Sequence, residues 1–161
     1  MHIPHRARVF WPLFAVWVVA DFVTKRIVES RLMPHIPTNV AGDWIRFTLN
    51  YNTGAAMNIS VGDASRAVFA VLAIVMLAVI FGMYRRTPAH ETVQPIALAL
   101  IAAGALGNLL DRLRSARGVV DFIDVGIGDT RFWTFNVADS GVTMGALLLM
   151  FVLWSKPAAQ D

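Results

Sequence analysis

The 161-residue sequence contains no cysteine. Disulfide bonds, thiolate nucleophiles and cysteine-based metal sites are therefore excluded. Charged residues are scarce as well, at 16% of the chain against about 25% in a typical soluble domain. Histidine is limited to four dispersed positions without metal-ligand spacing: His2, His5, His35 and His90. We accordingly expect no metal ion and no other cofactor.

Apolar residues, in contrast, are abundant. They make up 57% of the chain, and the mean hydropathy is +0.57. A soluble domain has about 45–50% apolar residues, so both values indicate a protein of the lipid bilayer. The net charge of +3 and the pI near 10 could suggest nucleic acid, but the basic residues are scattered among apolar segments. We therefore expect contact with lipid headgroups and no binding of nucleic acid.

Four apolar segments approach the roughly 20 residues that a helix needs to cross a bilayer. They cover residues 9–28, 67–84, 95–112 and 137–154. The third segment is short, but small residues at Gly104 and Gly107 would allow close helix packing. The first segment also resembles a secretory signal peptide, yet it continues past Asp21 without a convincing cleavage site. We expect four retained spans in a single domain over residues 1–161.

Two longer connections, residues 29–66 and 113–136, separate these spans. Residues 44–49 (WIRFTL) are aromatic and β-branched with partial alternation, which predicts a strand. The following NYNTGAA has turn chemistry, and its Asn52 either makes a turn or donates to a bound peptide backbone. Glycines interrupt the second connection, for which we expect a loop or short helix. The predicted fold is thus an all-α integral membrane bundle of four helices with a small β-element at the membrane surface.

The orientation in the membrane is ambiguous from charge alone. The termini and the short link share one side and hold five Lys or Arg, whereas the other side holds nine of the 14. A raw count would therefore invert the protein. The rule applies best to short flanking segments, and two compact pairs of this kind, Arg6 with Arg8 and Arg85 with Arg86, favour cytoplasmic termini.

Two acids in the polar stretch between the last two spans are the leading catalytic candidates. Asp121 lies in the second long connection, and Asp139 lies in the first turn of the fourth span. A carboxylate at a membrane boundary is costly unless it is paired or hydrated, so such residues are functional candidates. Two adjacent carboxylates cannot both ionise easily, so one stays an acid while the other acts as base. Such a pair can activate water against a peptide carbonyl without a metal.

Each of these acids has a simpler interpretation. Asn136 lies three residues before Asp139, a spacing typical of a helix cap with an acid in the first turn. This capping role is compatible with catalysis, because a cap can also orient a catalytic acid. Asp121 could be an exposed loop acid, and Asp124 competes with it three residues on.

Further polar residues lie near the span ends. Asn108 and Arg112 are four residues apart and share a helical face. Arg112 could stabilise oxyanion charge or hold a catalytic carboxylate, or simply pair with Asp111 at the helix end. Asp21 and Lys25 have the i,i+4 spacing of a favourable ion pair, which is more often structural.

Five sequence blocks together resemble the lipoprotein signal peptidase (signal peptidase II) family. They are DFVTK at 21–25, NTGAAM at 52–57, GALGNLLDR at 104–112, VVDF at 119–122 and FNVADS at 135–140. One block would be weak evidence, but these five occur in the family's order over a chain of the right length.

The resemblance implies a membrane-embedded aspartyl endopeptidase of the bacterial inner membrane. Such enzymes cut diacylglyceryl-modified prolipoproteins on the N-terminal side of the lipidated cysteine. It also implies cytoplasmic termini, an active site at the periplasmic face, a β-cradle over the substrate and inhibition by globomycin; we expect a monomer. The family's catalytic acids correspond to Asp121 and Asp139. Its supporting residues correspond to Asp21, Lys25, Asn52, Gly54, Asn108, Arg112 and Asn136.

The sequence departs from the family pattern at three places. Phe22 replaces a usual Gln, Met57 replaces a usual Phe, and the loop at 113–118 is unusually basic.

Two alternatives from other functional classes stay open. An ion pathway would also use membrane acids, although these cluster at one face and no inverted repeat is visible. A catalytically inactive scaffold for lipoprotein precursors is the other.

Overall fold

The computed structural model describes residues 3–54 and 62–155, and within these ranges four helices are long and apolar enough to cross a membrane. These helices are α1 (His5–Arg31), α2 (Ser65–Arg86), α3 (Val93–Arg114) and α4 (Val137–Ser155). Every predicted span lies inside one of them. The helices run a few residues beyond the predicted limits, because backbone hydrogen bonding continues into their polar ends. The expected four-helix membrane fold with a small sheet is confirmed.

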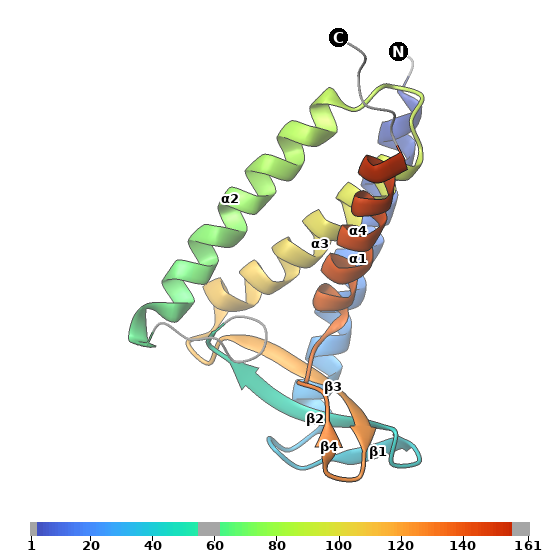
Figure 1. The fold of residues 1–161 in the computed structure, drawn as a ribbon. Helices are drawn as coiled ribbons and strands as arrows, with labels where there is room; N and C mark the ends of the chain where they lie inside the picture. Colours follow the sequence, from blue (N-terminus) through green and yellow to red (C-terminus); the bar gives the residue numbers. More distant parts are fainter. Residues whose placement is uncertain (1–2, 55–61, 156–161) are drawn as a thin grey trace.

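Helix α3 occupies the centre of the bundle. Most of its apolar stretch is buried, and it packs against each of the other three helices. The apolar stretches of α1, α2 and α4 are largely exposed, as expected for surfaces that face lipid. In Figure 1 the start of α1 and the end of α4 lie at one end of the bundle, while the sheet lies beyond the other.

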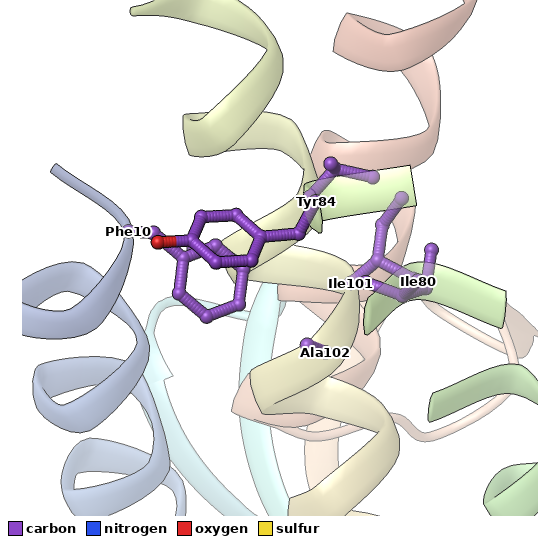
Figure 2. Packing of buried hydrophobic residues seen from close by; sticks show 7 residues of the cluster. Phe10, Ile80, Tyr84, Ile101 and Ala102 are labelled. Atoms are coloured by element: carbon purple, nitrogen blue, oxygen red, sulfur yellow. The ribbon is translucent and has the colours of Figure 1, made fainter. Parts of the chain in front are cut away.

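An aromatic and aliphatic cluster holds three helices together at the end away from the sheet (Figure 2). The rings of Phe10 on α1 and Tyr84 on α2 face each other with centroids 4.4 Å apart. Ile80, Ile101 and Ala102 pack beside them and join α2 to α3. Because lipid is as apolar as these side chains, the stabilisation comes from van der Waals packing and not from exclusion of water.

Small residues on α3 allow neighbouring elements to approach closely. A Cβ atom at Gly104 would overlap the carbonyl oxygen of Ala138 on α4. A Cβ atom at Gly107 would overlap the Asp21 carboxylate on α1. The close packing expected at these two glycines is therefore present, and it brings the functional ends of three helices together.

The sheet is antiparallel and has the strand order β1-β2-β3-β4. Its strands are β1 (Thr38–Ala41), β2 (Ile45–Asn52), β3 (Val119–Ile127) and β4 (Thr130–Arg131). Leu49 on β2 packs with Val120 and Phe122 of β3 and Val28 of α1. This cluster fixes the sheet against the end of α1 and leaves the polar residues of β2 for the other face.

The prediction for the second connection was wrong. Residues 113–136 were expected to form a loop or short helix, but α3 continues to Arg114 and half of the remainder forms β3 and β4. Strand β3 gains its partner from β2, about 70 residues earlier in the chain, and such pairing leaves no local signal. The strand expected at residues 44–49 is confirmed in type and corresponds to β2, which extends further to Asn52.

Candidate active site

Asp121 lies on β3, directly opposite Asn50 of β2 in the strand register. Its side chain is buried, with 4% of the residue exposed. Both carboxylate oxygens accept hydrogen bonds, from Asn52 Nδ2 at 3.1 Å and from Asn136 Nδ2 at 2.7 Å. Asp121 is therefore a strand residue with fixed partners, and its interpretation as an exposed loop acid is wrong.

Burial is the main cause that raises the pKa of Asp121 to about 7, and the nearby negative charge of Asp139 contributes to this rise. The hydrogen bonds from Asn52 and Asn136 oppose this shift because they favour the charged form. A carboxyl group with this pKa is partly protonated at neutral pH. Asp121 can therefore donate a proton at neutral pH, whereas an aspartate with the ordinary pKa is ionised there and cannot act as an acid.

Asp139 lies in the first turn of α4 and forms a reciprocal cap with Asn136. The Asp139 backbone N–H donates to Asn136 Oδ1 at 2.9 Å, and the Asn136 backbone N–H donates to Asp139 Oδ2 at 3.1 Å. The other carboxylate oxygen, Oδ1, accepts from Asn108 Nδ2 at 2.7 Å. The expected capping arrangement is therefore present, and it also fixes the direction of the carboxylate.

Asn136 connects the two acids. Its side chain is fully buried and is oriented by the cap, since Oδ1 accepts from the Asp139 backbone. The amide nitrogen then points to Asp121 Oδ1 and also approaches Asn108 Oδ1 at 3.2 Å. One side chain thus fixes the N-terminus of α4 and the Asp121 carboxylate at the same time.

A buried ammonium group on α1 organises the neighbouring residues. Lys25 Nζ lies 2.8 Å from Asp21 Oδ2, 2.9 Å from Asp111 Oδ2 and 3.0 Å from Asn108 Oδ1. Because Asn108 Oδ1 accepts from Lys25, its amide nitrogen is directed at Asp139. Asp21 Oδ1 accepts from the backbone N–H of Ala138, which gives the N-terminus of α4 a second acceptor. Lys25 therefore positions the Asp139 carboxylate through Asn108.

Arg112 has different partners from those that the sequence suggested. Its guanidinium donates to the carbonyl oxygens of Gly54 at 2.6 Å and Asn108 at 3.2 Å. Asp111 instead pairs with Lys25, so the pairing of Arg112 with Asp111 is wrong. Asn52 makes the expected turn, in which its Oδ1 accepts from the Gly54 N–H at 2.9 Å. Its Nδ2 donates to Asp121, a partner that the sequence did not suggest, and donation to a bound peptide backbone stays a prediction.

Asp124 and Asp111, the other acids near the site, have partners of their own. Asp124 Oδ1 lies 2.8 Å from Arg131 Nε, and its Oδ2 accepts from Thr48 Oγ1 at 3.0 Å. Asp111 Oδ2 contacts Lys25 and accepts from the Val120 N–H at 3.2 Å. The role of Asp111 in the Lys25 group was missed from the sequence. Its position one turn after Asn108 on α3 was the available signal.

Two of the departures from the family pattern, Phe22 and the basic loop at 113–118, contact residues other than the two acids. Phe22 is half exposed on α1, under the guanidinium of Arg26. In the basic loop at 113–118, Arg117 lies 4.1 Å above the ring of Tyr51 and pairs with Glu29 at 3.5 Å. Met57 lies outside the described residues.

Asp121 and Asp139 open onto one cavity of about 1100 Å³ between the sheet and helices α2, α3 and α4. Its polar lining includes Asn52, Asn108 and Arg112. Its apolar walls come mainly from α2 and α4: Phe69, Leu72, Ala73, Met76, Val142 and Met144. The cavity thus combines two acids at a polar end with apolar helix surfaces, a combination that suits a substrate with both peptide and hydrocarbon parts.

Comparisons with known proteins agree with this geometry. A family model described as Signal peptidase (SPase) II matches residues 13–155. A lipoprotein signal peptidase of Ectopseudomonas mendocina is 40% identical over 159 residues, which cover 93% of this chain and 94% of that one. One from Pseudomonas putida is 36% identical, with coverages of 96% and 92%. A solved bacterial membrane enzyme superposes with a TM-score of 0.86 at 29% identity and covers 100% of this chain and 98% of its own.

Proposed function

Because the chain belongs to the signal peptidase II family, it is an aspartic peptidase that removes signal peptides from prolipoproteins, and we propose Asp121 and Asp139 as its catalytic pair. One observation carries this assignment. The two carboxylates, from a strand and a helix, open onto one cavity and share the amide side chain of Asn136. Such an arrangement serves acid–base hydrolysis.

The proposed reaction uses one proton shared by the pair. Asp121, with its raised pKa, holds this proton at the start, and the Asp139 carboxylate is the base. Asp139 takes a proton from water while the water oxygen attacks the scissile carbonyl carbon, and Asp121 protonates the carbonyl oxygen. Asp139 then returns its proton to the amide nitrogen, the C–N bond breaks, and Asp121 recovers its proton from the diol as the carboxylic acid forms.

The residues around the pair would position it and support the charge that develops. Asn108 and Asn136 donate to the two carboxylates and keep them aligned. The Arg112 guanidinium lines the same cavity and adds positive charge near the carbonyl oxygen under attack. Lys25 and Asp21 hold Asn108 and the start of α4 in place. These contacts support the seven proposed accessory residues, with Asn52 and Gly54 completing the turn beside Asp121.

The cavity suits a diacylglyceryl-modified substrate that is cut on the N-terminal side of its lipidated cysteine. The apolar walls on α2 and α4 would receive acyl chains and the signal peptide from the bilayer, since the outer faces of both helices are exposed and apolar. Figure 1 shows α2 diverging from α1 and α4 toward the sheet, and residues of α2 and α4 line the cavity. Globomycin-type inhibitors would occupy the same cavity, and the chain would act as a monomer.

The proposed location is the bacterial inner membrane, with the sheet and the active site on the periplasmic side. Two compact basic pairs support this orientation, because they flank helix ends at the bundle end opposite the sheet: Arg6 with Arg8, and Arg85 with Arg86. Lipoprotein precursors reach that face once their mature part has crossed the membrane.

The proposal is tested with purified protein and a diacylglyceryl-modified prolipoprotein. We compare the native chain with Asp121→Asn, Asp139→Asn and, as a matched control, Asp124→Asn. Either change in the pair should lower kcat by about 10²–10⁴-fold, because it removes acid–base catalysis. The control should retain activity, because Asp124 pairs with Arg131 away from the cavity.

The site would be established if the native chain cuts before the lipidated cysteine and if both Asp121→Asn and Asp139→Asn abolish this cleavage. Activity that survives Asp121→Asn but not Asp124→Asn would transfer the acid role to Asp124. A native chain that binds the precursor and never cuts it would make this protein a scaffold.

A further inference from the structure

Beside the two acids, three polar side chains form a row along the sheet side of the cavity. They are His35, Asn50 and Thr134, named here the polar row, and all three line the cavity. His35 Nδ1 lies 2.8 Å from Asn50 Oδ1, and Asn50 Nδ2 donates to Thr134 Oγ1 at 3.1 Å. None of these residues contacts Asp121 or Asp139 through a hydrogen bond among the described residues. The proposed chemistry therefore leaves the polar row without a role.

The backbone holds His35 in an unusual conformation. Its φ of +64° lies in the left-handed region, which few residues other than glycine adopt and in which Asn, Asp and His are the most frequent exceptions. A hydrogen bond from the His35 N–H to the Leu49 carbonyl at 2.9 Å fixes this turn against β2. Residues held in such conformations by their surroundings are concentrated at functional sites.

The hydrogen bonds of Asn50 determine what His35 presents to the cavity. Because Asn50 Nδ2 donates to Thr134, its Oδ1 faces His35 and can only accept. His35 Nδ1 therefore carries the hydrogen of this contact, and Nε2 is the second polar atom of the ring. Among the residues that the structure describes, nothing occupies Nε2. The Thr134 hydroxyl accepts from Asn50, and no acceptor in the described part of the chain takes its own hydrogen, which leaves it for a ligand.

The position of the polar row relative to Asp121 indicates which part of a substrate it meets. Asn50 and Asp121 are directly paired across β2 and β3, so their side chains lie about 5 Å apart on one face of the sheet. An extended peptide advances about 3.3 Å per residue. A chain with its scissile carbonyl at Asp121 therefore reaches the polar row within one or two residues.

The direction follows from the bundle. The signal peptide and the acyl chains require the apolar helix walls, whereas the sheet lies beyond the helix ends (Figure 1). Only the chain that follows the lipidated cysteine leads away from the bilayer. We propose that the polar row is a specificity subsite that hydrogen-bonds a hydroxyl or amide side chain directly after the lipidated cysteine. This inference rests on the proposed function and adds a selectivity to it.

The test uses two lipidated precursors that differ only in the residue after the modified cysteine, Thr in one and Val in the other. The two side chains have nearly the same shape, but only Thr can hydrogen-bond. We expect the native chain to prefer the Thr substrate by about two- to tenfold in kcat/KM, the range of one neutral hydrogen bond. In His35→Asn this ratio should fall toward about 1, because Asn accepts the left-handed backbone but removes the imidazole.

His90→Asn is the matched control, since His90 is exposed in the link at the far end of the bundle; its ratio should equal the native one. A partial loss of folded protein cancels in the ratio. Equal cleavage of both substrates by the native chain, or an unchanged preference in His35→Asn, would overturn the subsite and leave the peptidase intact. Failure of the native chain to cut either substrate would overturn the proposed function and the subsite with it.

Discussion

At the scale of single residues, the raised pKa of Asp121 leads to a pH dependence of the reaction. The pair needs one shared proton, which is lost as the pH rises through about 7, because Asp121 is buried beside the charge of Asp139. Above that pH, kcat/KM should fall about tenfold per unit. Toward lower pH, activity should hold until the second carboxylate also becomes protonated. Initial rates between pH 5 and 9 on one lipidated precursor give this profile.

The same pH profile measured on His35→Asn shows whether the loss of activity comes from the two acids or from His35, which lines the same cavity. Tyr51 also lines the cavity, but burial and the charge of Glu29 raise its pKa above the ordinary value near 10, so it stays neutral over this range. Rates that stay constant from pH 7 to 9 would show that Asp121 does not act as the proton donor.

The sequence identifies the two acids more readily than their partners. Asp121 and Asp139 stand in recognisable motifs, and the Asn136 cap follows from a local three-residue spacing. The contact of Lys25 with Asp111 joins α1 to α3 across 86 positions, so it depends on helix packing that no local pattern encodes. From the sequence, His35 was considered only as a possible metal ligand. Its place in the cavity was not predicted, because it depends on a turn that the His35 N–H fixes against β2.

At the scale of helices, the contact between α3 and α4 sets the position of Asp139. Gly104→Ala would gain up to about 1 kcal/mol of helix propensity, but its Cβ would overlap the carbonyl of Ala138. Overpacking of this kind costs about 1–3 kcal/mol. We therefore expect a lower Tm in detergent. Because Ala138 precedes Asp139, a lower kcat should accompany it.

Gly82→Ala is the matched control for this change. It lies within α2, and a Cβ atom there meets nothing within 4 Å. Its Tm should stay the same or rise, with native activity. An equal rise in Tm for both variants would show that α3 and α4 can separate without cost.

The helices and the strands differ in how far the sequence determines them. Each span is encoded by its own apolar run, so its location is predictable, and only its polar ends were missed. Strand β2 was predicted from alternation, whereas β3 was missed despite its β-branched and aromatic residues. Gly126 and Gly128 suggested a loop, and the partner that makes β3 a strand lies on the far side of two helices in sequence.

At the scale of the whole molecule, the absence of cysteine makes the orientation directly measurable. Single cysteines placed at His90 or Asp129 lie in exposed links at opposite ends of the bundle. With the outer membrane made permeable, a maleimide that cannot cross the inner membrane should label Asp129→Cys. His90→Cys should react only after lysis.

The cysteine-free parent chain provides the background control for labelling. Cleavage activity of each variant shows that the fold is retained. The opposite labelling pattern would place the sheet and the two acids in the cytoplasm and would remove the proposed access to translocated precursors.

The shared use of Asn136 has a consequence for how the enzyme is made. Asn136 lies at the start of α4, which is synthesised after β3, and its side chain caps this helix while it donates to Asp121. A chain still emerging during synthesis therefore carries the first acid without its partner or its clamp. The two acids therefore become a pair only once α4 has packed against the rest of the bundle.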